Sequence, residues 1–373
     1  MAIRLVHGGI VHKSLCILVG VAATLSAFAG TALAGHTAVS IKGEDFYLNG
    51  SPTYKGRTWN GHRIEGLLLN FRMVNGIFDD LNPSTVHMWA YPDTRKWDPN
   101  RNTNEFVAAM SDWHAHGLLA VTVNLQGGSP QGFSHGAQTW INSAFTSKGS
   151  LEKPYFDRLT KILDRADQLG MVVILGYFYQ GQDHRVSGNT AVETGVDNAT
   201  NWVLSHGYTN VVIEINNECD QHYANTILQP ANVAQLITRA KNISVGGHHL
   251  LVSTSYSQGL PQSNVVAVAD FILVHGNGIS SPSTIGSDVR QIRVMCGRNP
   301  RPIVFNEDDH YNFNLSTNDM EQAVANHGSW GYFDFRRSGE SFANGFQSMP
   351  ADWKIDSTRK TDFFNYLKSI TGF

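Results

Sequence analysis

Short apolar runs alternate with amphipathic stretches along most of this 373-residue chain, and this alternation limits the available folds more than any other feature. The runs have the length and the apolar character of buried strands. Eight such runs are found, at residues 85–91, 118–125, 171–178, 211–216, 250–255, 271–275, 302–305 and 331–335. In between, apolar residues recur every three or four positions, as in helices that cover a sheet. These helix-like stretches are residues 104–116, 155–169, 191–205, 232–242 and 287–296.

Eight strands separated by helices predict an α/β fold closed as a (β/α)₈ TIM barrel. An open, doubly wound sheet is the alternative, but it usually carries a glycine-rich phosphate-binding turn after its first strand, and none follows here. Before the first run, Asn49-Gly50 lies between two β-prone stretches and predicts an N-terminal β-hairpin. A ninth strand candidate, residues 53–59, is assigned to this hairpin, which we expect to plug the bottom of the barrel.

The N-terminus has the order of a secretory signal peptide. Arg4 and Lys13 precede an uncharged apolar run at residues 15–29, and small residues end at Ala34. We therefore predict a signal peptide over residues 1–34 and a single catalytic domain over residues 35–373. The mature protein is expected to be secreted or periplasmic, without stable insertion in a membrane.

Composition narrows the function classes. Charged residues make up 16% of the chain and the formal net charge is −3, so no basic field indicates a nucleic-acid partner. Aromatic residues reach 10%, with eight Trp and twelve Tyr, which suits carbohydrate binding but also a large core. Cys219 and Cys296 are expected at opposite ends of the barrel, about 20 Å apart, which is too far for a disulfide. We predict two free, mostly buried cysteines.

Two strand-like runs end in a glutamate. Glu218 follows the fourth run and Glu307 follows the seventh. The carboxyl ends of barrel strands form the active-site face, and two carboxylates across one pocket are the groups that break glycosidic bonds. Glu214 lies in the middle of its strand, so we interpret it as a buried interior carboxylate that is structural rather than catalytic.

These glutamates resemble those of a known group, clan A of the glycoside hydrolases. Its members are retaining (β/α)₈ enzymes that include the family 5 cellulases and mannanases. Their acid/base lies in an Asn-Glu pair after strand four, matched by Asn217-Glu218, and their nucleophile is a Glu after strand seven, matched by Glu307. The opening from Phe46 to Pro52 resembles their Phe-x-x-Asn-Gly-x-Pro motif.

The resemblance implies a retaining β-glycoside hydrolase that cleaves a β-linked poly- or oligosaccharide through a covalent glycosyl-enzyme intermediate, without a cofactor. Glu218 would be the acid/base, with a raised pKa, and Glu307 the ionised nucleophile. Asn217 would bind the sugar 2-hydroxyl.

Three departures separate the chain from family 5. Cys219 follows the acid/base where Pro is common. The sixth strand of family 5 ends in His-x-Tyr, whose Tyr holds the nucleophile, whereas this chain has Asn277 two residues after His275. Either His275 or Asn277 takes the place of that Tyr. The Arg that contacts the nucleophile from an early strand has no counterpart near Asn124 or Gln126. The chain is therefore expected to be related to family 5 but distinct from it.

Other strand-end residues are candidates for substrate binding because aromatic rings stack on sugars and amides bind hydroxyls. The candidates are Trp89, Gln126, Tyr177, His275, Asn277 and Trp330. Either Trp330 or Phe333 is expected to form a sugar platform. Trp97 and residues 98–102 are expected to form a long loop that walls one side of the cleft.

Two other functions stay open at this point. One is a carbohydrate-binding barrel without efficient turnover, which the missing Tyr and Arg contacts would favour. The other is a transglycosylase, in which a sugar replaces water at the intermediate. Acidic and histidine side chains that follow the two glutamates could bind a divalent metal, but we predict no metal and expect them to contact substrate or the glutamates. These side chains are Asp220, His222, Asp308, Asp309 and His310.

Overall fold

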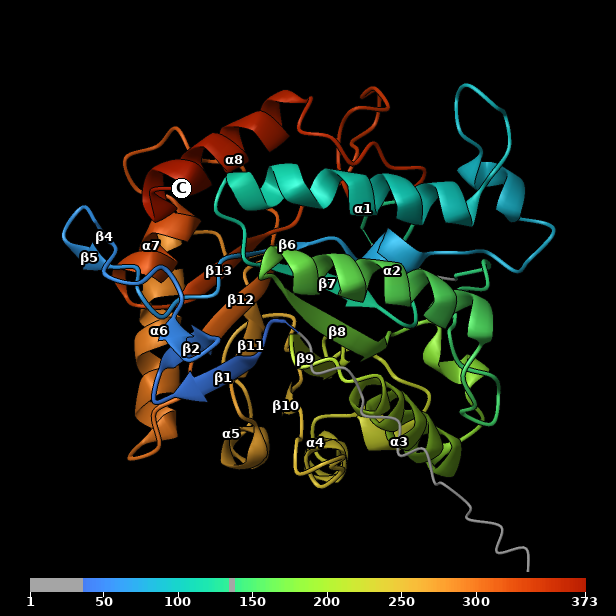
Figure 1. Cartoon of the computed structure of the whole chain (residues 1–373), viewed down its shortest axis with the longest axis horizontal. Coiled ribbons are helices and arrows are strands. Elements are labelled where there is room, and N and C mark those ends of the chain that lie inside the picture. Colours follow the sequence, from blue (N-terminus) through green and yellow to red (C-terminus); the bar gives the residue numbers. More distant parts are fainter. Residues whose placement is uncertain (1–35, 134–137) are drawn as a thin grey trace, which may run out of the picture. The chain divides into compact units, whose positions relative to one another are not determined.

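The structure is a computed structural model that describes residues 36–133 and 138–373. The predicted signal peptide and its cleavage site lie outside these residues, so the division at Ala34 stays a prediction. Eight parallel strands form one sheet in the order β10-β9-β8-β7-β6-β13-β12-β11 (Figure 1). The strands are β6 (Asn70–Arg72), β7 (Ala120–Asn124), β8 (Val172–Phe178), β9 (Val211–Asn216), β10 (Leu251–Ser253), β11 (Ile272–His275), β12 (Ile303–Asp308) and β13 (Ser329–Tyr332).

The barrel closes between its fifth and sixth strands through backbone bonds outside the regular ladder. The N–H of Asp270 donates to the carbonyl of Val252 at 3.0 Å, and the N–H of His275 donates to that of Tyr256 at 3.0 Å. The predicted (β/α)₈ barrel is therefore confirmed.

Helices cover the outside of the barrel, as Figure 1 shows for α1 and α2. They are α1 (Pro99–Ala115), α2 (Lys153–Leu169), α3 (Asn189–Ser205), α4 (Val233–Lys241), α5 (Ser263–Val268), α6 (Pro282–Cys296), α7 (Asp319–Ala325) and α8 (Thr358–Thr371). The five predicted helices are confirmed, while α5, α7 and α8 were not predicted. The ends of α2 have ordinary causes: Pro154 lies in its first turn, and Gly170 ends it in the left-handed region at φ 74°.

The first strand was predicted in the wrong place. Residues 85–91 contain a short 3₁₀ helix, η2 (Val86–Trp89), instead of a strand. Asp80 fixes this segment, because its Oδ2 accepts hydrogen bonds from Thr85 Oγ1 at 2.6 Å and from Trp89 Nε1 at 2.8 Å. The true first strand is β6, which is too short for a pattern to reveal. Because one wrong strand replaced one missed strand, β9 and β12 still occupy the fourth and seventh positions.

The predicted long loop from Trp97 through residue 102 is also wrong. Asp98 caps α1 instead, since its carboxylate accepts from the backbone N–H groups of Asn100 and Arg101, each at 2.9 Å. Trp97 stacks on Tyr91 with ring centroids 5.8 Å apart. This segment therefore starts a helix and does not wall the cleft.

The N-terminal hairpin is confirmed. Three antiparallel strands, β1 (Val39–Lys42), β2 (Asp45–Leu48) and β3 (Ser51–Pro52), form a separate sheet. Asn49 and Gly50 connect β2 to β3 with φ of 51° and 79°, the left-handed pair that a two-residue hairpin favours. A second small hairpin pairs β4 (Thr58–Trp59) with β5 (His62–Arg63).

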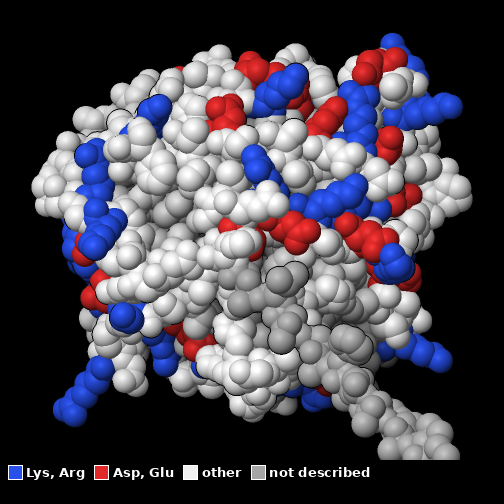
Figure 2. All heavy atoms as spheres, in the orientation of Figure 1, with Lys and Arg blue, Asp and Glu red and all other residues white. Residues whose placement is uncertain are grey.

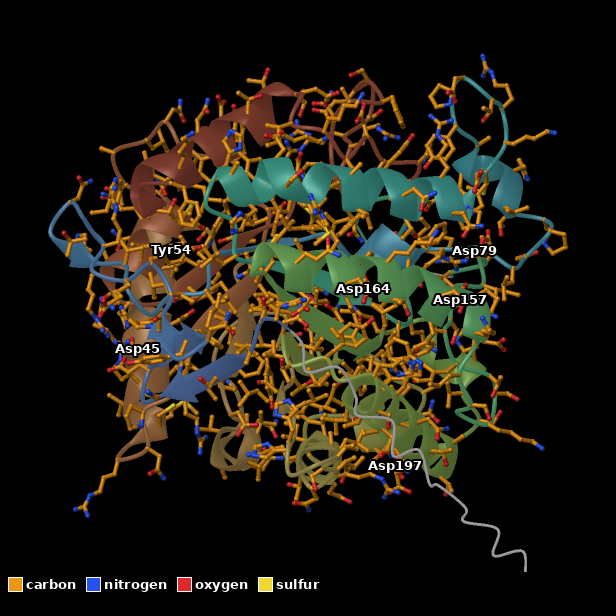
Figure 3. The ribbon with its side chains drawn as sticks, in the orientation of Figure 1. Asp45, Tyr54, Asp79, Asp157, Asp164 and Asp197 are labelled. Carbon is orange, nitrogen blue, oxygen red and sulfur yellow. The ribbon has the colours of Figure 1, made fainter. Side chains whose placement is uncertain are left out.

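This sheet lies against the amino-terminal ends of the barrel strands, as expected for a plug. Phe46 is fully buried and packs edge-on against Phe271, just before β11. The N–H of Val39 donates to the carbonyl of Thr209, just before β9, at 2.9 Å. Farther along, the hydroxyl of Tyr54, labelled in Figure 3, donates to the carbonyl of Gly117 at 2.8 Å. The opposite end of the barrel is left for the site.

Cys219 and Cys296 are both free and buried, as predicted. Among the helices of the described residues, none has the length and apolar character needed to cross a bilayer. On the face shown in Figure 2, acidic and basic side chains lie interspersed rather than in a broad field of one sign.

Candidate active site

A β-bulge turns Glu307 into the barrel. Val274 of β11 pairs with Phe305, but the next residue, His275, pairs with Glu307, so Asn306 is an extra residue in β12. Both Asn306 and Glu307 can then face inward, which regular alternation forbids. Asn306 Nδ2 donates to Glu214 Oε2 at 3.3 Å, inside the barrel. The bulge therefore brings a carboxylate to the mouth of the barrel directly above the interior polar layer.

Glu218 reaches the site by a different route. It lies two residues beyond β9 and has a φ of 47°, a left-handed conformation that is unusual for a residue other than glycine. Ser255, after β10, holds this turn: the N–H of Glu218 donates to Ser255 Oγ at 2.8 Å, and the N–H of Cys219 donates to the Ser255 carbonyl at 2.9 Å. A strained backbone held by a neighbouring strand end is typical of functional positions.

The structure brings the two predicted catalytic glutamates together around His275. The nearest side-chain ligand atoms of these three residues all lie within 4.8 Å of one another. His275 Nδ1 is 3.0 Å from Glu218 Oε1 and 3.6 Å from Glu307 Oε2. The imidazole, which is fully buried, therefore bridges the carboxylates.

Arg72 and Asn277 hold Glu307. Asn277 Nδ2 donates to Glu307 Oε1 at 2.6 Å, and Arg72 Nε forms a close ion pair with Glu307 Oε2. The sequence left open whether His275 or Asn277 replaces the Tyr that holds the nucleophile in family 5. In the structure Asn277 holds Glu307 directly, and His275 makes a second, longer contact.

Arg72 is the arginine that the sequence analysis did not find. It lies at the end of β6, the strand that was misplaced, and is almost completely buried. Its guanidinium also lies 3.5 Å from Glu214 Oε2 and donates to Asn217 Oδ1. Correct placement of β6 would have been the signal, since a strand-ending arginine in a barrel is a candidate for the site.

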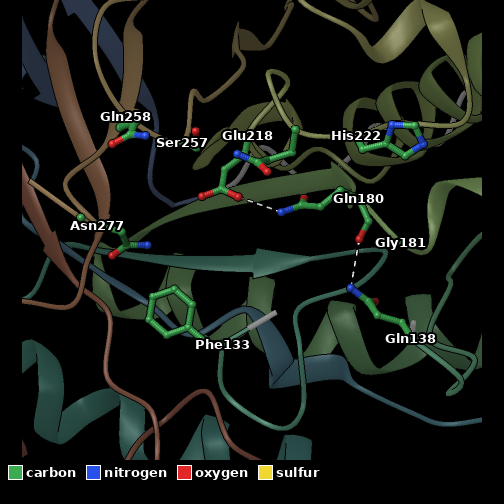
Figure 4. Close-up of a pocket in the computed structure, with 11 residues that line it drawn as sticks. Phe133, Gln138, Gln180, Gly181, Glu218, His222, Ser257, Gln258 and Asn277 are labelled. Atoms are coloured by element: carbon green, nitrogen blue, oxygen red, sulfur yellow. Dashed lines mark hydrogen bonds between the residues drawn. The ribbon is translucent and has the colours of Figure 1, made fainter. Parts of the chain in front are cut away.

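Gln180 holds Glu218 from the end of β8. Its Nε2 donates to Glu218 Oε2 at 2.8 Å, and its Oε1 accepts from Asn217 Nδ2 at 3.0 Å. Figure 4 shows Gln180 beside Glu218, with Asn277 across the pocket. Tyr223 fixes the neighbouring backbone, since its hydroxyl donates to the Asn217 carbonyl. Asn217 thus links Arg72 to Gln180 and joins the surroundings of both glutamates.

The protonation of the pair differs from the expectation. Burial raises the pKa of Glu307, and this effect outweighs the lowering by Arg72 and His275. Burial also acts to raise the pKa of Glu218, but His275, Arg72 and Gln180 together hold that pKa below its usual value. The pKa of His275 is raised, because Glu307 and Glu218 outweigh its burial. The pKa of Glu307 therefore lies above that of Glu218, the reverse of the order expected for a nucleophile and its acid.

Glu214 is the buried interior carboxylate that the sequence predicted. It is fully buried and accepts from Asn306 and from Arg72. It contributes a negative charge below the site, which helps to keep the Arg72 guanidinium there.

A cavity of about 640 Å³ opens beside Glu218. Its outer rim carries three exposed side chains, Gln221, His222 and Gln258. A second, narrow pocket of about 40 Å³ lies between the two glutamates and the loops after β7 and β13. It is lined by Arg72, Gly132, Phe133, Tyr179, Glu218, Glu307, Phe333 and Gln347. Phe333 therefore faces the catalytic pair, which favours it over Trp330 as the aromatic platform.

Of the seven predicted substrate-binding residues, only Asn277 lines one of these two spaces, the large cavity. Asn217 and His275 are buried beside the glutamates, with the contacts described above. The other four are also buried and are hydrogen-bonded within the protein. Trp89 donates to Asp80, as described above. Gln126 Nε2 donates to Ser143 Oγ at 3.1 Å. The Tyr177 hydroxyl lies 3.1 Å from Thr200 Oγ1, and Trp330 Nε1 donates to Asp308 Oδ2 at 2.9 Å. Strand-end position alone did not reveal which side of the strand each residue faces.

Two groups of the described residues could supply ligands to a cation. The first is the catalytic group itself, in which His275 Nδ1 is engaged with Glu218. The second is Asp308, His310 and Asp319. The Asp308 carboxylate raises the pKa of His310 to about 9, so in the metal-free protein this imidazole carries a proton at neutral pH. Asp220, also considered as a ligand, accepts from Ser257 Oγ at 2.7 Å.

Comparison with known proteins places the fold. No protein-family model matches the chain, and no curated protein matches its sequence. Solved structures do resemble it. A β-mannanase from the blue mussel Mytilus edulis is 13% identical, with a TM-score of 0.51, over 90% of this chain and 97% of that chain.

Two further structures are similar to the same extent. A glycoside hydrolase family 5 mannosidase from Rhizomucor miehei is 12% identical, with a TM-score of 0.53, over 90% of this chain and 97% of that chain. A GH5-4 broad specificity endoglucanase from Bacteroides salanitronis is 10% identical, with a TM-score of 0.52, over 82% and 93%. At this level of identity the likeness shows a shared fold, and it confirms that the chain has the barrel architecture of the clan A glycoside hydrolases.

Proposed function

We propose that this protein is a retaining β-glycoside hydrolase that cleaves a β-linked poly- or oligosaccharide. The observation that carries the proposal is the carboxylate pair at the ends of the fourth and seventh strands, with oxygens within 4.8 Å of each other. Retaining enzymes place their two carboxyl groups roughly 5–5.5 Å apart, whereas inverting enzymes need about 6.5–9.5 Å to admit a water between carboxylate and sugar. The close approach of Glu218 and Glu307 supports retention.

Glu307 is suited to act as the nucleophile. Its carboxylate attacks the anomeric carbon while the bond from that carbon to the leaving oxygen breaks, which forms a glycosyl ester with Glu307. Arg72 and Asn277 hold the two oxygens of Glu307, and the Arg72 charge stabilises its ionised form. A carboxylate held on both oxygens loses little orientational freedom when it reacts.

Glu218 is suited to act as the acid and then as the base. It gives a proton to the leaving oxygen in the first step. In the second step it takes a proton from water, whose oxygen attacks the anomeric carbon and releases Glu307.

In the resting site, however, the pKa of Glu307 lies above that of Glu218, so a proton shared by the pair is favoured on Glu307. Because His275 Nδ1 lies 3.0 Å from Glu218 Oε1 and 3.6 Å from Glu307 Oε2, we infer that His275 passes its proton to Glu218 when the sugar occupies the pocket. The imidazole then takes up the proton that Glu307 loses, so Glu307 is left ionised and the ring returns to its starting state.

The similar structures guide the choice of substrates. Their names are β-mannanase, mannosidase and endoglucanase, so β-mannosides and β-glucosides are the first compounds to test. We also propose that the protein works outside the cytoplasm, because of the signal-peptide pattern at residues 1–34. The argument for a barrel without turnover is weaker than the sequence suggested, since Arg72 and Asn277 supply the contacts that had been missing.

The test is hydrolysis of a panel of aryl β-glycosides by the purified protein and by Glu307→Gln. We expect the variant to lose activity on every substrate that the wild type cleaves, with the β-anomer as first product of the wild type. A 2-deoxy-2-fluoro glycoside should label Glu307 covalently, as seen by mass spectrometry of peptides.

Glu193→Gln, on the outer helix α3, is the matched control and should keep full activity. Full activity of Glu307→Gln, or an α-anomer as first product, would contradict the mechanism. Products longer than the substrate would instead indicate a transglycosylase.

A further inference from the structure

The space around the catalytic pair is strongly asymmetric. The narrow pocket of about 40 Å³ holds only a few water molecules, since one water needs about 10–15 Å³ by this measure. Of the residues that line it, only Phe133 and Glu218 retain appreciable exposure. The cavity of about 640 Å³ on the other side of Glu218 ends at exposed side chains. The described residues therefore leave room for a glycan on only one side of the carboxylate pair.

The chemistry of the proposed function, on which this inference rests, identifies the two sides. Glu307 bonds to the anomeric carbon, so the sugar that is transferred lies against Glu307, at the junction of the two spaces, with only its far edge in the narrow pocket. Glu218 protonates the leaving oxygen, so the leaving group lies beside Glu218, in the large cavity. Glu307 lines the narrow pocket but not the large cavity.

Two loops are joined to form the closed end of the narrow pocket. One follows β7 and the other follows β13. The N–H of Met349 donates to the carbonyl of Pro130 at 2.7 Å. Gly132, at φ 105°, lies so close to the second loop that a Cβ there would be 3.0 Å from the ring of Phe335. Within the described residues, these contacts close the gap between the two loops.

Aromatic packing reinforces the closure. The ring of Phe133 packs edge-on against Phe333 at 5.6 Å and against Phe335 at 5.0 Å between centroids. Phe133 and Glu218 line both the narrow pocket and the large cavity, so the two spaces adjoin. A sugar ring at this junction would meet the Phe133 face on one side and the carboxylates on the other.

Gln347 closes the narrow pocket with a free acceptor. Its backbone N–H donates to Asp334 at 2.9 Å, its carbonyl accepts from Asn75 at 2.7 Å, and its Nε2 donates to Ser129 at 3.1 Å. Its Oε1 is buried and has no hydrogen-bond partner within the described part of the chain. A buried acceptor without a donor is costly, and a sugar hydroxyl is the donor that this pocket would receive.

We propose that the enzyme is exo-acting and removes one sugar at a time from the non-reducing end, with Gln347 Oε1 accepting a hydroxyl of that terminal sugar. The anomeric carbon that Glu307 attacks belongs to the sugar at the mouth of the narrow pocket. Since the pocket beyond that sugar has no room for another ring, the sugar must be the terminal one at the non-reducing end. The rest of the glycan, or another leaving group, occupies the cavity lined by Gln138, Gln180, Ser257 and Gln258.

The test compares aryl β-monoglycosides with aryl β-biosides of glucose and mannose. An exo-acting enzyme cleaves the monoglycoside directly, and it converts the bioside first to free monosaccharide and aryl monoglycoside. Release of intact disaccharide from the bioside as the main first product, or cleavage of the bioside but not of the monoglycoside, would overturn the proposal.

The failure of this inference differs from failure of the proposed function. An enzyme whose cleavage depends on Glu307 but releases disaccharide is a glycosidase that is not exo-acting. A protein that cleaves no member of the wider aryl β-glycoside panel, or whose cleavage survives Glu307→Gln, refutes the function itself and the exo-acting proposal with it.

Gln347→Met tests the acceptor, because it keeps the length of the side chain and removes the polar atoms. We expect kcat/KM on the preferred aryl monoglycoside to fall about 10- to 100-fold, with the product pattern unchanged. Among monodeoxy analogues of that substrate, one lacks the hydroxyl that Gln347 accepts. The wild type should cleave this analogue with a low kcat/KM, and Gln347→Met should lower that value little further.

Gln291→Met, on the outer helix α6, is the matched control and should behave as wild type. Thermal unfolding of all three proteins separates a lost contact from a lost fold. Gln347 does not bind a sugar hydroxyl if a stably folded Gln347→Met keeps kcat/KM within twofold of the wild type. The same conclusion follows if removal of each hydroxyl lowers kcat/KM by the same factor in both proteins.

Discussion

The two carboxylates that face each other in this site are held in different ways. Glu307 is part of β12, is 8% exposed, and has a guanidinium on one oxygen and an amide on the other. Glu218 lies beyond β9 in a left-handed conformation and is more exposed. Its oxygens accept from the neutral amide of Gln180 and from the titratable ring of His275.

This difference matches two kinds of chemical work. A nucleophile must present one oxygen to one carbon in a fixed direction, and a full charge beside it favours the ionised state. An acid/base must gain and lose a proton in each cycle, so a titratable neighbour is more useful than a permanent charge. The contacts of Glu307 thus fix the direction of its carboxylate, while those of Glu218 favour the exchange of protons.

Replacement of Glu218, the carboxyl group that exchanges protons, should give the largest effect on kcat/KM, and this effect should depend on the leaving group of the substrate. Glu218→Gln is expected to reduce kcat/KM by about 10⁴-fold on aryl glycosides with poor leaving groups. On a dinitrophenyl glycoside, which needs no proton, formation of the glycosyl-enzyme should be nearly unaffected. Added azide should then restore turnover and give a β-glycosyl azide, measured by product analysis.

The control for this comparison is Glu307→Gln, which should lose activity whatever the leaving group. If Glu218→Gln loses the same factor on good and poor leaving groups, and azide does not help, the two glutamates do not have the distinct roles that their surroundings indicate.

Replacement of Arg72, which holds Glu307 with a permanent positive charge, should have the next largest effect on the rate. Arg72→Lys keeps a positive charge but loses the planar set of donors that reaches Glu307, Glu214 and Asn217 together. We expect kcat to fall about 10²-fold for all leaving groups. Arg57→Lys is the matched control, because Arg57 donates to the backbone of α8 near the N-terminal hairpin, away from the site.

The thermal unfolding of Arg72→Lys must be measured beside its kinetics, since Arg72 is buried with its partners. A variant that unfolds near the wild-type temperature and keeps its full kcat would show that Arg72 serves only the barrel interior.

The sequence predicted the barrel well because its central strands are long. The strands β7, β8 and β9 are buried, largely apolar and five to seven residues long. The helices α2 and α3 between them have apolar residues at regular spacing. By contrast, β6 has only three residues, and no periodicity can be seen in so few. Because β6 ends in Arg72, the error in that strand also concealed a residue of the site.

The positions of the two glutamates, and the contact of Asn277 or His275 with Glu307, could be predicted, but the contributions of Arg72 and Gln347 could not. Position after a strand indicates which end of the barrel a residue occupies, and this was enough for Glu218 and Glu307. It does not indicate the direction of a side chain, which depends here on the bulge at Asn306 and on the turn held by Ser255. Trp89 and Tyr177 illustrate the limit, since both are buried and bonded elsewhere. Gln347 contacts the site from a distant loop and has no local pattern at all.

The smallest expected effect on rate, but the most specific one, comes from the residue between the carboxylates. His275 lowers the pKa of Glu218 and also that of Glu307. His275→Gln should therefore raise both pKa values, because a neutral amide replaces an imidazolium. In a bell-shaped profile of kcat/KM against pH, the two limbs report the apparent pKa values of the coupled Glu218–Glu307 pair.

Both limbs should consequently move to higher pH, while kcat at the new optimum falls only about 10-fold. His249→Gln, at the opposite end of the barrel before β10, should leave the profile unchanged. A residue that only fills space would lower the rate without a shift of the profile. A shift of one limb alone would show that His275 acts on only one of the two carboxyl groups, and the proposed proton path between them would then be wrong.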